Sequence, residues 1–135
     1  MTTARTLGAH HIGLTVPDLD AARGFFVDAL GFEQIGEVPE YPALFLTDGT
    51  VMLTLWRAED PAAAVAFDRR RNIGLHHFAL RVADHATLET LSAELASRDD
   101  VRIEFAPEAL GDGGLRHMML RVPGDIRLEL IATAA

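Results

Sequence analysis

Apolar and polar residues alternate in a short pattern that occurs twice in the chain. The first copy, HHIGLTV at residues 10–16, returns as HHFALRV at residues 76–82. Alternation with a period of two predicts a β-strand that buries one face in each copy. Four of the six histidines lie in these two matching pairs, so the repeat is a candidate for both structure and chemistry.

A helix and three further strands are predicted after the first copy. Asp18 is a suitable N-cap, apolar residues follow at helical spacing, and Gly31 stands where a glycine commonly ends a helix. Strands are predicted at residues 32–38, 43–47 and 51–56, and Asp48-Gly49 between the last two indicates a hairpin.

The second copy is followed by the same order of elements. Its strand is predicted at residues 75–82, and Asp84 can cap a helix with a stripe of Leu88, Leu91 and Leu95. The remaining segments are listed in order: a strand at 101–105, a loop at 106–114, and strands at 116–122 and 126–131. Residues 58–72 read as a linker, with a possible short helix at 61–67 after Pro61.

Two copies of a strand–helix–strand–strand–strand unit predict an α+β fold built from two βαβββ modules. Two units are too few for a solenoid, and one helix covers only one face of each small sheet. We therefore expect curved sheets around a metal-binding cleft within a single domain, residues 1–135. Module one is placed at 7–57, the linker at 58–72 and module two at 73–132.

The amino-acid composition argues against nucleic acid and membranes as partners. There is no cysteine, which excludes disulfides and thiolate ligands, and 20 acidic against 12 basic residues give a net charge of −8. Such a surface repels nucleic acid and anionic lipid, and no apolar run approaches the roughly 20 residues of a membrane span. With no signal-peptide pattern at the start, we expect a cytoplasmic protein. Arg69-Arg70-Arg71 is a local exception, either a solvated charge run or an anion-binding or salt-bridging group.

The order of elements, with His-x-x-Leu-x-Val opening each half, resembles the vicinal oxygen chelate superfamily. Supporting motifs are DLDAA at residues 18–22, FF at 25–26, LGF at 30–32 and LEL at 128–130. The resemblance covers nearly the whole chain. That superfamily includes glyoxalase-type lyases, extradiol dioxygenases, fosfomycin-modifying transferases, methylmalonyl-CoA epimerases and metal-free bleomycin-binding proteins.

The resemblance implies metal ligands on the first and fourth strands of each module. The matching positions are His11, Thr54, His77 and Glu129. Lyases and epimerases of the superfamily generally have a carboxylate or amide where Thr54 stands. The remaining three ligands resemble those of the dioxygenases and the fosfomycin-modifying group, which argues against a standard glyoxalase lyase.

The chemistry of these residues supports a metal site independently of the family. Two neutral imidazoles and one carboxylate bind divalent Fe, Mn, Zn, Ni or Co and leave coordination positions open for a substrate. By strand parity His11 and His77 share their faces with the small residues Gly13 and Ala79, whereas His10 and His76 point the other way as packed or surface residues. A lone strand histidine is more often structural, but the symmetric repeat favours ligation.

Further residues are candidates for the substrate pocket. His117 alternates with Met119 and Arg121 on one face of a strand, and as a histidine it is a candidate general acid or base. Glu129 is the other candidate catalytic residue. The other candidates are Thr54 and Trp56 as pocket residues, Tyr41 at the substrate end, and Arg81 or Arg127 for an anionic substrate.

Two functions remain open from the sequence. One is a metal-dependent enzyme, a lyase or a dioxygenase, acting on a small substrate that chelates the metal through neighbouring oxygens. The other is a metal-free protein that sequesters a small molecule, as the bleomycin-binding relatives do. The resemblance also implies a homodimer in which His11 comes from one subunit and His77 and Glu129 from the other.

Overall fold

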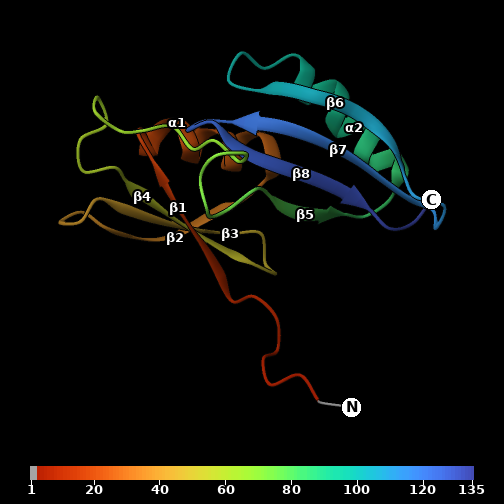
Figure 1. Ribbon diagram of the computed structural model, residues 1–135, viewed down its shortest axis with the longest axis horizontal. Helices are drawn as coiled ribbons and strands as arrows, with labels where there is room; N and C mark the ends of the chain where they lie inside the picture. Colours follow the sequence, from red (N-terminus) through yellow and green to blue (C-terminus); the bar gives the residue numbers. More distant parts are fainter. Residues whose placement is uncertain (1–2) are drawn as a thin grey trace. The chain divides into compact units, whose positions relative to one another are not determined.

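Each half of the chain folds into a four-stranded sheet with helical turns packed against it (Figure 1). The computed structural model describes residues 3–135, which divide into one unit ending at Ala64 and a second spanning Val65–Ala135. The predicted α+β architecture of two βαβββ modules is confirmed. No helix within residues 3–135 is long and apolar enough to cross a membrane.

The first unit has the strand order β1-β4-β3-β2, with β1 parallel to β4 and the other pairs antiparallel. Its elements are β1 (His11–Val16), α1 (Leu19–Gly24), the π-helix η1 (Phe25–Ala29), β2 (Glu33–Val38), β3 (Ala43–Thr47) and β4 (Met52–Arg57). Asp18 caps α1 as predicted, accepting a hydrogen bond from the backbone N–H of Ala21 at 3.0 Å. The predicted hairpin between β3 and β4 is also confirmed.

The first helix differs from its prediction in its second half. Its spacing predicts one regular helix, but from Phe25 onward the turns are π-helical. Phe25 and Phe26 are both fully buried, although they are neighbours in the sequence. The helix ends at Gly31, whose φ of +75° is a conformation that favours glycine.

The second unit has the equivalent strand order, β5-β8-β7-β6, with β5 parallel to β8. Its elements are β5 (Phe78–Val82), α2 (His85–Ala96), β6 (Arg102–Leu110), β7 (Leu115–Val122) and β8 (Ile126–Ala132). Helix α2 begins after Asp84, which accepts a hydrogen bond from the N–H of Thr87 at 2.7 Å. Leu88 and Leu95 of the predicted stripe are buried, and Leu91 is half-buried.

Two strand boundaries and one possible short helix differ from the prediction. β6 continues through Pro107 to Leu110 where a loop was expected. A proline fits there because β6 is an edge strand with shifts in its pairing to β7, so the missing N–H interrupts no regular ladder. β5 begins only at Phe78, so His77 immediately precedes it. The segment 61–67 forms a single turn rather than a helix.

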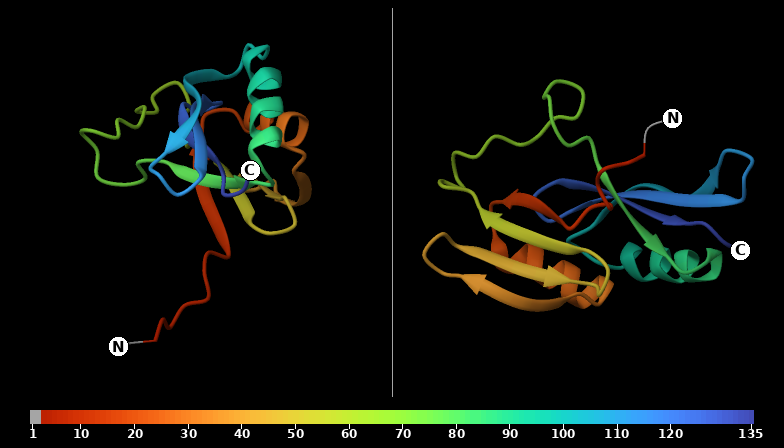
Figure 2. Two further views of the ribbon diagram at one scale, coloured as in Figure 1. Left: turned by 90° about the vertical axis from the view of Figure 1, so that its right-hand side faces the viewer. Right: turned by 90° about the horizontal axis from the view of Figure 1, so that it is seen from below.

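The sheet of the second unit has one apolar and one polar face. Alternate residues of β7 and β8, among them Leu120 and Leu128, are buried on the side that α2 covers (Figure 2). The intervening residues point to the opposite face; they are His117, Met119 and Arg121 on β7, and Arg127 and Glu129 on β8. The polar residues among them therefore share one surface of this sheet.

Candidate functional site

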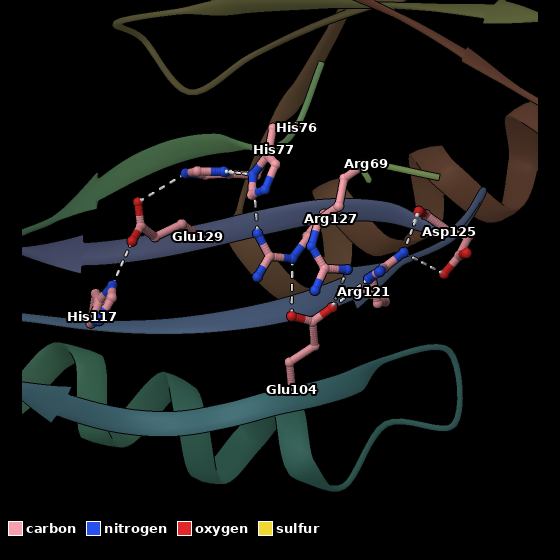
Figure 3. Close-up of polar contacts among 9 residues, drawn as sticks. All are labelled: Arg69, His76, His77, Glu104, His117, Arg121, Asp125, Arg127 and Glu129. Carbon is pink, nitrogen blue, oxygen red and sulfur yellow. Dashed lines mark hydrogen bonds and ion pairs between the residues drawn. The ribbon is translucent and has the colours of Figure 1, made fainter. Parts of the chain in front are cut away.

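The parallel pairing of β5 with β8 brings His77 next to Glu129. Ala79 lies opposite Glu129 in the register, and His77 precedes Ala79 by two residues, so its side chain points to the same face. Nε2 of His77 lies 3.6 Å from Oε1 of Glu129 (Figure 3). The first unit repeats this register, because Gly13 lies opposite Thr54. Thr54 and Glu129 therefore hold equivalent positions.

A second histidine binds the other oxygen of the same carboxylate. His117 is cross-strand from Ile131, and its Nδ1 lies 2.5 Å from Oε2 of Glu129. Both side chains are largely buried, with 10% and 12% of their surface exposed. Because an ionised carboxylate only accepts hydrogen bonds, Nδ1 of His117 is the donor. Its Nε2 lies 3.7 Å from Oε1 of Glu108, and the ring of Phe105 packs against it.

The neighbours of His77 determine which of its nitrogens carries the proton. Nη1 of Arg127 lies 3.3 Å from Nδ1 of His76, and a guanidinium can only donate, so this nitrogen of His76 is an acceptor. Desolvation and the charge of Arg127 lower the pKa of His76, which favours that neutral form. The Nδ1 atoms of His76 and His77 lie 2.7 Å apart, and the proton between them therefore belongs to His77.

In the tautomer with its proton on Nδ1, His77 presents the lone pair of Nε2 to Glu129. Two electron-pair donors then face each other across 3.6 Å, an arrangement that a shared cation stabilises. His77 and Glu129 fit a divalent metal for this reason, and His117 resembles the outer hydrogen-bond partners that orient metal-binding carboxylates. Within residues 3–135, no group of three or more histidine or acidic side chains is already arranged as a metal site.

The first unit has a matching histidine pair that includes His11, and a polar pair on β4. His11 is exposed, and its Nδ1 lies 2.9 Å from Nδ1 of His10, as in the second histidine pair. Thr54 is buried and accepts a hydrogen bond from Nε1 of Trp56 at 2.8 Å. A Cβ added at Gly13 would lie 3.2 Å from Oγ1 of Thr54, which explains a small residue there.

Arginines gather around Glu104 on the same face of the second sheet (Figure 3). Nε of Arg121 donates to one oxygen of Glu104 at 2.6 Å, and Nε of Arg127 donates to the other at 3.0 Å. Burial would raise the pKa of the Glu104 carboxyl, but these two hydrogen bonds outweigh it and hold the pKa below its ordinary value. The bond to Glu104 also raises the pKa of Arg121. Arg69 approaches the same carboxylate at 4.0 Å.

The structure brings together part of the predicted set and adds residues that sequence reasoning missed. His77, His117 and Glu129 are in contact, and Met119 lies on β7 between His117 and Arg121. Trp56 meets Tyr41 edge-on in the first unit, and Arg81 is exposed on β5. The residues missed are Glu104 and Glu108. Glu108 was missed because β6 was predicted to end at residue 105, and Glu104 because the sequence does not show which residues of the neighbouring strand it meets.

Comparison with known proteins identifies a family model and a similar enzyme. A family model described as the Glyoxalase/Bleomycin resistance protein/Dioxygenase superfamily matches residues 8–130. The chain is 29% identical over 147 aligned positions to a 2-epi-5-epi-valiolone epimerase from Actinomyces sp., covering 93% of this chain and 79% of that protein.

Two solved structures share the fold at lower identity. A glyoxylase/bleomycin resistance protein/dioxygenase domain from Frankia sp. EAN1pec has a TM-score of 0.80 and 22% identity, covering 94% of this chain and 98% of that one. A lactoylglutathione lyase from Agrobacterium tumefaciens has a TM-score of 0.70 and 22% identity, with 96% of each chain covered. At such identities these similarities establish the fold alone.

Proposed function

Because this chain belongs to the Glyoxalase/Bleomycin resistance protein/Dioxygenase superfamily, we propose that it is a divalent-metal-dependent enzyme. Its substrate is a small molecule with two neighbouring oxygens. The observation that carries the proposal is the approach of Nε2 of His77 to Oε1 of Glu129 at 3.6 Å, with His117 bound to the other carboxylate oxygen. His11 completes the proposed ligand set.

The reaction that fits best is proton transfer at a carbon next to a carbonyl, as in an epimerisation. A divalent cation supplies Lewis-acid polarisation of the substrate oxygens, which makes the neighbouring C–H more acidic. Support for epimerisation comes from the name of the Actinomyces relative, 2-epi-5-epi-valiolone epimerase. A lyase or dioxygenase reaction stays a second prediction for the same donor set. Thr54 favours the dioxygenase, because lyases and epimerases of the superfamily generally have a carboxylate or amide at that position.

Three residues of the second unit have separate roles in the proposed reaction. Glu129 is held through Oε2 by His117, which fixes its orientation and leaves Oε1 beside His77. Because His117 donates through Nδ1, its neutral ring keeps a lone pair on Nε2, which can take up a proton. Glu108, 3.7 Å from that nitrogen, can pass the proton to solvent because its own side chain is more than half exposed.

Metal binding is tested with purified, metal-stripped protein by calorimetric titration with Mn²⁺, Fe²⁺, Co²⁺, Ni²⁺ and Zn²⁺. One ion per chain is expected for the preferred metal, and His11→Ala, His77→Ala and Glu129→Gln are each expected to abolish that binding. Glu89→Gln, which removes a carboxylate paired with Arg116 on a different surface, serves as the matched control. Absence of binding by any of the five metals would contradict the proposal and favour a metal-free sequestering protein.

The reaction class is tested with the compound named in the relative. The loaded protein is incubated with 2-epi-5-epi-valiolone in D₂O and followed by ¹H NMR. Deuterium incorporation at a carbon beside the carbonyl, lost in Glu129→Gln, would support proton transfer. A protein that binds metal but exchanges no deuterium would contradict epimerisation of this compound and leave the metal site standing.

We further propose that the site is shared between the two subunits of a homodimer. His11 belongs to the first unit, and His77 and Glu129 to the second. Large apolar side chains that stand fully exposed, Leu7 at 104% and Ile73 at 105% of their reference surface, suit burial against a second copy. Mixing His11→Ala with Glu129→Ala subunits under exchange conditions is expected to restore one intact site per heterodimer. A mixture that stays metal-free after exchange would contradict the shared site.

A further inference from the structure

Three arginines with unfilled donors converge beside the candidate metal ligands. Arg121 and Arg127 each use Nε on Glu104, and Arg69 reaches the same carboxylate from the segment before β5 (Figure 3). Asp125 contacts Nη1 of Arg121. Two carboxylates against three guanidiniums leave one net positive charge in this cluster, in a protein whose overall charge is −8.

The cluster has hydrogen-bond donors to spare. A guanidinium carries five N–H groups, yet among residues 3–135 no polar contact is made by Nη2 of either Arg121 or Arg127. No buried side-chain nitrogen or oxygen in that range lacks a partner. The unpaired amino groups therefore reach solvent-accessible space.

Partial burial makes these donors effective for an anion. The side chains of Arg127, Arg121 and Arg69 are 12%, 15% and 24% exposed, so solvent screens their charges less than it would at a free surface. Glu104 fixes the first two in place through both of its oxygens. Arginines held in this way need little further ordering to bind phosphate or carboxylate through paired N–H groups.

The position of the cluster connects it to the proposed active site. Arg127 and Glu129 are alternate residues of β8 and point to the same face. Two residues along a strand span about 7 Å. An anionic group bound by Arg127 would therefore lie within the length of a small substrate whose neighbouring oxygens approach Glu129.

We propose that Arg69, Arg121 and Arg127 form an anion-binding subsite for an oxyanionic group of the substrate, a phosphate or a carboxylate. The identification of the anion as part of the substrate rests on the proposed function, and it implies a charged substrate in place of 2-epi-5-epi-valiolone, which carries no phosphate or carboxylate. Glu104 is a positioning residue that holds two of the arginines. This assigns a role to the first arginine of the run at residues 69–71 and to Arg127, and it leaves Arg81 outside the subsite.

The subsite is tested in metal-stripped protein, so that its outcome is independent of metal binding. Inorganic phosphate and acetate are titrated separately at constant ionic strength, and the arginine Nε–Hε signals are followed by ¹H–¹⁵N NMR. Saturable shifts of the Arg121 and Arg127 signals are expected with at least one anion, and the anion that saturates at lower concentration identifies the group. Shifts with neither anion would overturn the proposal.

Variants separate anion binding from a purely structural ion-pair network. Arg127→Gln is expected to weaken anion binding about tenfold or more, whereas Arg81→Gln, an exposed arginine of the same sheet, leaves it unchanged. Glu104→Gln removes the carboxylate that positions Arg121 and Arg127, and it is expected to weaken anion binding several-fold while metal affinity stays unchanged, provided that it is assayed while folded. A purely structural ion-pair network would show no saturable anion binding in the unmodified protein. Equal affinity in Arg127→Gln and Arg81→Gln, or unchanged affinity in folded Glu104→Gln, would overturn the proposal.

Failure of the subsite and failure of the metal enzyme are distinguishable. Metal affinity measured on Arg127→Gln reports whether the ligand set is intact. If the unmodified protein binds metal normally but binds no anion, the proposed subsite alone is contradicted. If the protein binds an anion but no metal, the proposed subsite is supported and the proposed metal-dependent function is contradicted.

Discussion

Nδ1 of His117 lies 2.5 Å from Oε2 of Glu129, so that one oxygen of this carboxylate is committed to a protein hydrogen bond and the other faces His77. The two residues come from adjacent antiparallel strands, β7 and β8, and both are largely buried. A carboxylate anchored through one oxygen has less rotational freedom to lose when the other oxygen binds a cation. The relationship makes His117 a positioning residue for Glu129 as well as a candidate acid or base.

Loss of the His117 hydrogen bond is expected to weaken metal binding without removing a ligand. His117→Leu should raise the metal dissociation constant about 10- to 100-fold, the usual effect of losing an outer hydrogen-bond partner. His117→Asn keeps an N–H donor near the position of Nδ1 and should recover most of the affinity. Calorimetric titration of metal-stripped protein measures both. Unchanged affinity in His117→Leu, or equal losses in the two variants, would refute the positioning role.

The sequence predicted the repeat and its main consequence, the approach of His77 to Glu129. Strand periodicity places β1 and β3 correctly, whereas the expectation that His77 and Glu129 lie at one site came from the resemblance to the superfamily, and the β5–β8 pairing accounts for their proximity. The contact of His117 with Glu129 could not be predicted in this way. It depends on the register between β7 and β8, which a two-residue periodicity does not specify.

The arginine cluster was hidden for a different reason. Glu104 was expected near the end of a short strand, and Arg69 in a linker. Only the irregular pairing of β6 with β7 shows that Glu104 binds Arg121 and Arg127 together. Local propensity read Pro107 as a strand breaker, whereas an edge position tolerates it.

Thr54 stabilises the first unit through its bond to Trp56 rather than through charge. Thr54→Val preserves the shape of the side chain but removes the acceptor of the indole Nε1–H, which is 2.8 Å away. We expect a loss of about 1 kcal/mol or more in the free energy of unfolding, because a partly buried donor loses its partner. Trp56→Phe in the Thr54→Val background removes that donor, and a double-mutant cycle by urea denaturation should show positive coupling. Additive effects would contradict the role of this bond.

Glu104 should make the stability of the second unit depend on pH in the acidic range. Its folded pKa is depressed, since the hydrogen bonds from Arg121 and Arg127 outweigh its burial. The stabilisation is therefore complete above the unfolded value of about 4.3 and is lost as the pH falls through the lower folded pKa. Glu104→Gln should be less stable than the unmodified protein at pH 7, and the difference should shrink below about pH 4. A difference that is constant with pH, measured by urea denaturation, would contradict this linkage.

Replacing Gly31, which follows the first helix, with alanine is expected to lower the free energy of unfolding. Its φ of +75° lies in the left-handed region, where an L side chain costs about 1 kcal/mol or more. A Cβ there would meet nothing within 4 Å, so the cost comes from the backbone alone. Gly113 is the matched control, because its added Cβ also meets nothing and its φ lies outside that region. Gly31→Ala should lower the unfolding free energy by about that amount, whereas Gly113→Ala should be neutral or slightly stabilising; equal effects in urea denaturation would show that the φ of Gly31 is not what ends the helix.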